Sequence, residues 1–157
     1  MNKYKNECPQ YEKRGREIMK KIFDISSAIT DYEFTEGEYD NVDMYFTSAG
    51  TQCVGELKYR IDYNSDSYII TKYGVMIDEH KLLGMLNQDK VPFYIMIFPD
   101  KVGYRFRLDE IDFSKLEKKS IQRQKTTVGE NRNIITRNSY ILPLALGHKF
   151  SFKKLHS

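Results

Sequence analysis

Apolar residues recur every three or four positions between about Gln10 and Ile25, with charged residues between them. This spacing places the apolar side chains on one face and predicts an amphipathic helix. Pro9 suits the first turn of that helix, because the first helical N–H groups have no partner within the helix. A second pattern of this kind, from Gly74 to Asn87, predicts another helix, with residues 78–81 on its polar side.

Alternating or continuous apolar runs elsewhere in the chain predict strands. Two of these runs flank Ser48 to Thr51, where Gly50 permits the positive φ that tight hairpins need. The polar stretch 120–138 is interpreted as a loop, and a short helix is expected after Phe113. The predicted strands are 28–36, 43–47, 52–61, 92–98, 102–108 and 139–146, with 68–72 as a short extended piece.

The order of these elements indicates the fold class. The helix predicted between the third and fourth strands implies that these strands run parallel, joined by a right-handed crossover. We therefore expect an α/β fold with a mixed central sheet flanked by helices. A length of 157 residues suits one domain. Its core is expected over about 10–110, with a basic C-terminal extension of the same domain over 114–157.

Composition narrows the class of protein. The 12 tyrosines and 9 phenylalanines supply apolar surface for a globular core. No apolar run approaches the roughly 18 residues of a membrane-spanning helix, and residues 1–10 lack the apolar stretch of a signal peptide. Cys8 and Cys53 lie far apart and are interpreted as free thiols in a reducing compartment. We therefore expect a cytoplasmic protein that does not bind a membrane.

The net charge of +3 hides an uneven distribution along the chain. Residues 114–157 carry a net charge of +8, whereas residues 1–113 carry −5. An acidic body suits the binding of cations, and a basic C-terminal third suits the binding of a polyanion. A basic tail that is merely solvated explains the same counts, so the charge alone leaves both interpretations open.

Three charged residues of the predicted hairpin carry the clearest chemical signal. Glu56 and Lys58 are two positions apart in a strand, so their side chains lie on the same face. If Ala49 and Gly50 form a two-residue loop, Asp43 pairs opposite Glu56, with Cβ atoms about 4.5–5.5 Å apart. Two carboxylates this close repel each other unless a cation lies between them. Oxygen ligands of this kind favour a hard divalent ion such as Mg²⁺.

The same residues also allow a purely structural interpretation, in which they form a solvated, charge-balanced sheet face together with Arg60. Asp43, however, lies between Val42 and Met44 and so begins an apolar strand. The alternate positions of the second strand, from Cys53 to Ile61, are apolar enough to pack inward. These two features favour a site over a solvated surface.

The arrangement resembles the PD-(D/E)xK nuclease superfamily, in which an acidic residue ends one strand and an acidic-x-Lys triplet occupies the next. Asp43 matches the first acid, and Glu56-Leu57-Lys58 matches the triplet. Asn41 stands where the family name has proline, a position without a chemical role. The family core is a helix, a three-stranded meander, a helix and a strand, which is the order predicted here over about 10–98. The resemblance therefore implies a restriction-endonuclease-like core.

Two positions of the site stay open in this resemblance. Many members carry a glutamate on the first helix near the metal, which Glu17 would supply here, with Glu12 as the weaker alternative. Asp40 competes with Asp43 as the first acid, although its side chain would face away if the strand has already begun.

The resemblance implies divalent-metal-dependent hydrolysis of phosphodiester bonds. Mg²⁺, for which Mn²⁺ would substitute, would be held by Asp43, Glu56 and the backbone carbonyl of Leu57. Lys58 would orient the attacking water, and Glu17 would hold a second ion or a water. The expected enzyme is a small endodeoxyribonuclease of the phage or resolvase type, acting in the cytoplasm of a bacterial or phage-infected cell. Dimerisation is common in this class and stays open here.

Contacts with nucleic acid are expected from basic residues outside the triplet. Lys81 on the second helix, or alternatively Lys72, would contact phosphate beside the site, and an ordinary exposed lysine is the structural interpretation of either one. A catalytically inert nucleic-acid-binding module, or a phage protein-interaction module on the same fold, is the alternative. The sequence leaves open DNA or RNA, the form of the substrate and the position of the cut. The basic residues of the C-terminal third that would contact phosphates are Arg123, Lys125, Arg132 and Arg137.

Overall fold

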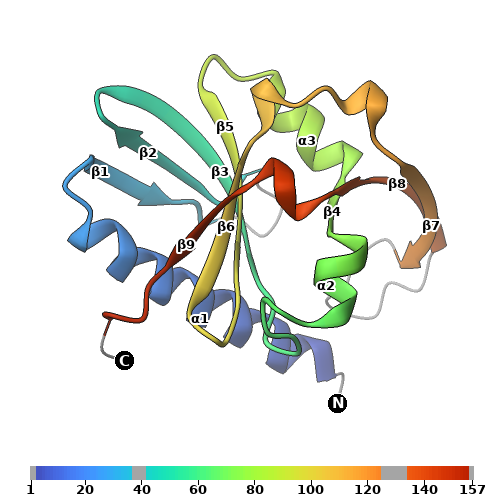
Figure 1. The fold of residues 1–157 in the computed structure, drawn as a ribbon, viewed down its shortest axis with the longest axis horizontal. Helices are drawn as coiled ribbons and strands as arrows, with labels where there is room; N and C mark the ends of the chain where they lie inside the picture. Colours follow the sequence, from blue (N-terminus) through green and yellow to red (C-terminus); the bar gives the residue numbers. More distant parts are fainter. Residues whose placement is uncertain (1–2, 37–41, 125–133, 156–157) are drawn as a thin grey trace.

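The computed structural model describes residues 3–36, 42–124 and 134–155, and its largest element is a six-stranded mixed sheet. The predicted α/β class with a mixed sheet is therefore confirmed. The strands of the sheet are β1 (Ile29–Phe34), β2 (Met44–Ser48), β3 (Thr51–Tyr59), β5 (Val91–Ile97), β6 (Val102–Arg107) and β9 (His148–Ser151), in the spatial order β1-β2-β3-β5-β6-β9. Figure 1 shows this sheet with helices and a smaller sheet around it.

The predicted N-terminal helix is present as α1 (Lys3–Ile25). It begins earlier than expected, so Pro9 lies inside the helix rather than in its first turn, and that expectation was wrong. The helix packs closely on β3 at Gly15, where a Cβ atom would come within 3.0 Å of the Cβ atom of Tyr59. Met19 and Phe23, one and two turns further on, are buried against the same face of the sheet.

The first three strands form the predicted antiparallel meander, and the register of its second hairpin is the predicted one. Ser48 pairs with Thr51, and the pairing continues to Met44 opposite Gly55. The two loop residues between these strands have φ values of 48° (Ala49) and 80° (Gly50). Positive φ at both positions matches the right-handed twist of the strands, which is why so short a loop can fix the register.

The parallel pairing of β3 with β5 is confirmed, but the segment between them differs from the prediction. Residues 68–72 are helical, in α2 (Tyr68–Tyr73), because the Ser67 hydroxyl caps the helix by accepting from the Ile70 N–H. The expected long helix is divided into strand β4 (Val75–Asp78) and a shorter helix, α3 (Glu79–Leu86). An apolar run beside a polar turn fits a short strand as well as a helix, so periodicity alone did not separate them.

The C-terminal region also contains more regular structure than expected. Strands β7 (Lys118–Gln124) and β8 (Ile134–Leu142) pair with each other, and β8 pairs with β4, giving a second sheet of order β4-β8-β7. The described parts of 120–138 are therefore strand rather than loop. The short helix expected after Phe113 is a single 3₁₀ turn, Phe113–Lys115. Two further 3₁₀ turns lie at Leu108–Glu110 and Leu144–Leu146.

Two apolar cores lie on opposite faces of the six-stranded sheet. One lies under α1 and includes Met19, Phe23, Leu57 and Ile95. The other lies between the sheet and the segments from α2 to β8, and includes Val54, Tyr94, Met96, Phe106, Ile70, Leu82 and Leu142. In Figure 1, α1 runs below the strands, whereas α2, α3 and the second sheet lie to their right. Because side chains alternate along a strand, Glu56 and Lys58 of β3 belong to the second face.

Candidate functional site

Asp43 and Glu56 lie together at the edge of β3, just beyond the first residue of β2. The Asp43 N–H donates to the carbonyl of Gly55 at 2.9 Å, although Gly55 already lies opposite Met44, so the ladder is irregular here and the predicted pairing of Asp43 with Glu56 is not formed. The Asp43 carboxylate then accepts the Leu57 N–H, with 2.8 Å between the nitrogen and Oδ2. The side chain of Asp43 therefore takes the place of the next β2 residue in the ladder, which holds its carboxylate beside Glu56.

Glu56 is an unusual carboxylate because its side chain is 4% exposed. Its Oε2 atom is buried and has no hydrogen-bond partner among the described residues. The pKa of Glu56 is raised from 4.5 to about 7, with burial as the largest cause and the charge of Asp43 as the second, whereas Lys58 and Lys81 lower it. A buried carboxylate that remains costly to ionise beside two cations is a candidate for direct coordination of a further cation.

Two lysines approach the Glu56 carboxylate from different elements. The Nζ atom of Lys58 lies 3.5 Å from Oε1, and that of Lys81, from α3, lies 3.8 Å from Oε2. The crowded surroundings of Lys58 would lower its pKa, but the charges of Glu56, Tyr94 and Asp43 outweigh them and raise it. The Lys58 side chain is still 44% exposed, so a charged ammonium group faces solvent at the mouth of the site.

The backbone of Leu57 contributes a carbonyl oxygen on the same side. The N–H and C=O of one residue point the same way in an extended strand, and the Leu57 N–H points toward Asp43. The Leu57 carbonyl therefore also points to the edge of β3 where Asp43 lies. The structure thus brings together Asp43, Glu56, Lys58 and this carbonyl, which the sequence assigned to the site, and adds Lys81, which was expected beside the site as a contact to phosphate.

The predicted helix acid does not join them. Glu17 is exposed on α1 and pairs with Arg14, at 3.5 Å between NH1 and Oε2. The weaker alternative, Glu12, is also exposed. The residue of α1 that reaches the site is Arg16, whose guanidinium lies 3.3 Å from Oδ1 of Asp43 and also donates to the Thr35 carbonyl.

A signal for this arrangement was present in the helix pattern. Successive helical residues are about 100° apart, so Glu17 stands about 200° from the buried Met19. It therefore points away from the sheet. Arg16 lies at the margin of the buried face, from which a long side chain reaches the sheet edge.

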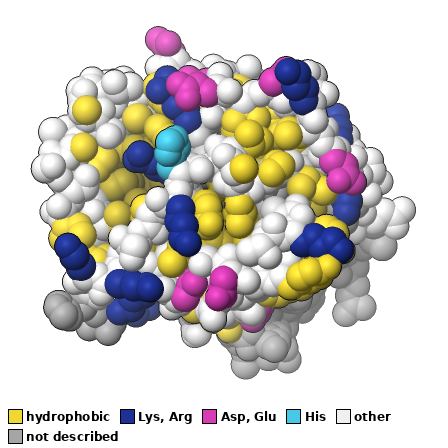
Figure 2. Space-filling model, viewed as in Figure 1, with side chains coloured by type: hydrophobic (Ala, Val, Ile, Leu, Met, Phe, Trp, Pro, Cys, Tyr) yellow, Lys and Arg dark blue, Asp and Glu magenta, His cyan; other side chains and the backbone are white. Residues whose placement is uncertain are grey.

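The predicted contacts with nucleic acid are only partly described by the structure. Arg137 lies on β8 with its NH1 atom 3.9 Å from Oδ2 of Asp78, so it takes part in an ion pair within the fold. On the face shown in Figure 2, the described lysines and arginines are interspersed with acidic and apolar side chains. Four predicted positions lie outside the described residues or side chains: Asp40, Arg123, Lys125 and Arg132.

The fit of a divalent metal rests on two carboxylates and one carbonyl. The Oε2 atom of Glu56, which has no hydrogen-bond partner among the described residues, and the adjacent Asp43 carboxylate form an oxygen-rich pair of the kind that Mg²⁺ prefers. Among the described residues, no three acidic, histidine or cysteine side chains gather in a group suited to a metal ion. A bound ion would therefore depend on water and substrate for its remaining ligands, which is usual for Mg²⁺.

Comparisons with known proteins add no family to this description. No family model, curated protein or solved structure matches the chain. Among the helices within residues 3–36, 42–124 and 134–155, none has both the length and the apolar character needed to cross a bilayer.

Proposed function

We propose that this protein is a divalent-metal-dependent nuclease with a restriction-endonuclease-like core. One observation carries the proposal: Asp43, Glu56 and Lys58 meet at one edge of β3, where an oxygen of the buried Glu56 lacks a hydrogen-bond partner. The element order supports it as well. A helix, an antiparallel meander, a crossover containing a helix and a parallel strand follow one another from α1 to β5.

The carboxylates of Asp43 and Glu56 and the carbonyl of Leu57 would hold the ion. When bound, a divalent metal polarises a scissile phosphate and makes water more acidic. Glu56 must lose its proton before it can bind the ion, because metal ligands bind in their deprotonated form. A pKa of about 7 means that Glu56 gains its charge near neutral pH.

Lys58 supplies the positive charge that faces the substrate. Its ammonium group is anchored by Glu56 at 3.5 Å and remains 44% exposed. It can donate to an attacking water or to a phosphate oxygen on which charge develops. A donor fixed in this way stabilises a transition state without having to reorganise.

A catalytically inert nucleic-acid-binding module is the second candidate, and one observation favours it. Arg16, Lys58 and Lys81 already pair with the two carboxylates. These three side chains can neutralise the two carboxylates without a metal ion, as an inert module would require. An inert module would bind nucleic acid in the presence of EDTA and would not cleave it with any metal.

The test of the proposed function is cleavage of plasmid, single-stranded and branched DNA, and of RNA, with Mg²⁺, Mn²⁺ or EDTA. Lys58→Ala should lower cleavage by about 10²–10³-fold, the usual cost of removing one preorganised donor. Its far-ultraviolet circular dichroism and its affinity for nucleic acid should stay nearly unchanged, because the side chain is half exposed.

Arg60→Ala is the matched control, because Arg60 is the next residue on the same face of this segment and is exposed. It should leave cleavage within a few-fold of the wild type. Equal cleavage by Lys58→Ala and the wild type would refute the role of Lys58. Binding without cleavage under every condition would favour the inert module.

A further inference from the structure

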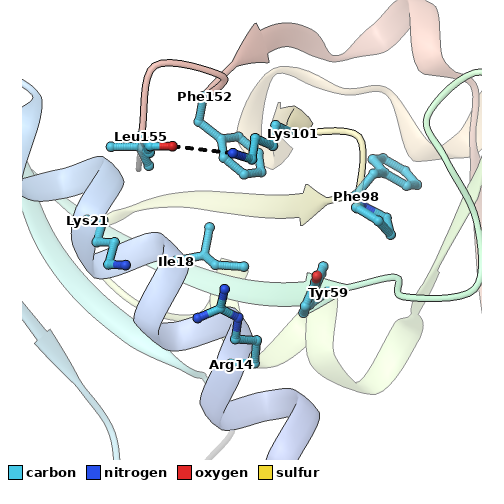
Figure 3. Close-up of a pocket in the computed structure, with 9 residues that line it drawn as sticks. Arg14, Ile18, Lys21, Tyr59, Phe98, Lys101, Phe152 and Leu155 are labelled. Carbon is cyan, nitrogen blue, oxygen red and sulfur yellow. Dashed lines mark hydrogen bonds between the residues drawn. The ribbon is translucent and has the colours of Figure 1, made fainter. Parts of the chain in front are cut away.

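A hollow of about 140 Å³ lies on the opposite face of the sheet from Glu56. It is bounded by α1, by the turn between β5 and β6, by the end of β3 and by the segment after β9. Figure 3 shows Arg14 and Lys21 extending toward it from α1 and Lys101 from the turn. Arg14, Ile18 and Lys21 are spaced by four and three residues, so they form one stripe along the helix.

The cations around the hollow are poorly compensated. None of the nine described residues that line it is acidic. Arg14 pairs with Glu17 only on the exposed side of the helix, where such pairs are weak. The Lys101 ammonium donates to the Leu155 carbonyl at 3.4 Å, a neutral acceptor. Lys21 has no ion pair among the described residues. A cleft lined by charges of one sign concentrates the opposite charge, here an anion.

The walls between these cations are apolar and partly aromatic. They include Ile18 and Pro99, with the side chains of Tyr59 and Phe152 beside them. An apolar cavity of roughly 150 Å³ accepts a benzene-sized ring. The hollow is open to solvent on one side, so it suits one ring of a flat base whose remainder projects outward, with the cations at its rim suited to a phosphate attached to that base through a short linker.

We propose that this hollow binds a nucleoside monophosphate, with the base against the apolar walls and the phosphate among Arg14, Lys21 and Lys101. The site involves none of the residues of the proposed nuclease centre. It would exist on this face whether or not the carboxylates of Asp43 and Glu56 hold a metal.

The test is titration calorimetry on the full chain with AMP as the probe. AMP has no phosphodiester bond, so its binding does not depend on nuclease activity. Adenosine lacks the phosphate, and inorganic phosphate lacks the base. Each should therefore bind at least about tenfold more weakly than AMP, a factor that corresponds to about 1.4 kcal/mol. Binding should also weaken as salt is added, because the contacts are ionic.

Lys21→Ala should weaken AMP binding about tenfold, because a hydrogen bond to a charged group is removed. Lys20→Ala is the matched control: the same residue type, one position earlier on the exposed side of α1. It should leave the affinity unchanged. Lys101→Met provides a second variant, which removes the charge and keeps the length of the side chain.

Several outcomes would overturn the proposal. Undetectable binding of AMP at millimolar concentration would exclude the site. Equal affinity for inorganic phosphate would reduce it to an anion site without a base pocket. Tighter binding of phenyl phosphate than of AMP would point to phosphorylated tyrosine in a protein partner instead. An equal loss of AMP affinity in Lys20→Ala and Lys21→Ala would show that the overall charge of α1, and not a specific contact of Lys21, attracts the nucleotide.

Discussion

The burial of Glu56 should make the stability of this protein fall as the pH rises through the neutral range. The pKa of its carboxyl is raised from 4.5 to about 7 in the folded chain. Between these two values the folded protein keeps a proton that the unfolded chain has lost, so stability decreases with pH. Each pKa unit corresponds to about 1.4 kcal/mol, and a shift of about 2.5 units therefore costs about 3 kcal/mol above neutral pH.

Glu56→Gln isolates this cost, because glutamine keeps the shape of the side chain and does not titrate. Lys58 and Lys81 lower the pKa of Glu56, and the value of about 7 already includes their attraction, so the remaining shift is a net penalty. Without divalent metal at about pH 8, the variant should be more stable than the wild type by up to about 3 kcal/mol. For a chain of this size that raises Tm by roughly 6–12 °C. Near pH 4, where the Glu56 carboxyl is mostly protonated in both the folded and the unfolded wild type, the advantage should nearly vanish.

The measurement is urea unfolding followed by circular dichroism, in EDTA, at a series of pH values from about 4 to 8. Glu12→Gln, which removes an exposed carboxylate of α1, is the matched control and should show no such trend. Parallel curves for the wild type and Glu56→Gln would refute the reasoning. A less stable Glu56→Gln at high pH would mean that Lys58 and Lys81 hold Glu56 ionised, so that burial is not the dominant effect.

Two further predictions concern the ion and the packing of the helix. Millimolar Mg²⁺ or Mn²⁺ should raise the Tm of the wild type by mass action and should not raise the Tm of Asp43→Ala. Differential scanning fluorimetry, together with calorimetry of metal binding, measures both. An equal rise in the two proteins would show that Asp43 does not bind the metal. Gly15→Val should lower the free energy of unfolding by about 1–3 kcal/mol through overpacking. A Cβ atom at position 15 alone would already lie 3.0 Å from the Cβ atom of Tyr59. Unchanged urea unfolding would mean that α1 lies further from β3.

The residues that the sequence predicted well are those whose positions are fixed by local chemistry. The loop of Ala49 and Gly50 sets the register of β2 and β3, and the alternation along β3 then places Glu56 and Lys58 on one face. Together these two local rules predicted Asp43 close to Glu56, although the backbone of Asp43 bonds to Gly55 and its side chain to the Leu57 N–H instead of pairing with Glu56. This part of the site was predictable because Asp43, Glu56 and Lys58 belong to one hairpin and the residue next to it.

The parts that were missed depend on contacts between distant segments. Strand β4 has four residues and pairs with β8, more than fifty positions further along the chain. Strands β8 and β7 are polar over much of their length, and a polar stretch without periodicity predicts a loop. Only their pairing with each other and with β4 identifies them as strands. Arg16 was missed for a related reason: its contact with Asp43 depends on how α1 lies across the sheet, which the helix pattern alone does not determine.

The balance of charge at the site bears on whether it favours a metal or is complete without one. Arg16 and Asp43 are both partly exposed, and ion pairs of this kind contribute at most about 1 kcal/mol. Arg16 is therefore a weak competitor for a divalent ion. The two lysines lie at 3.5 and 3.8 Å from Glu56, distances at which they offset the burial of the carboxylate incompletely. The pKa of about 7 expresses what remains. A cation that binds the Glu56 oxygen directly would remove this remaining cost, which is the physical reason for proposing a metal here and the reason that Glu56→Gln and the metal titration test the same idea from two sides.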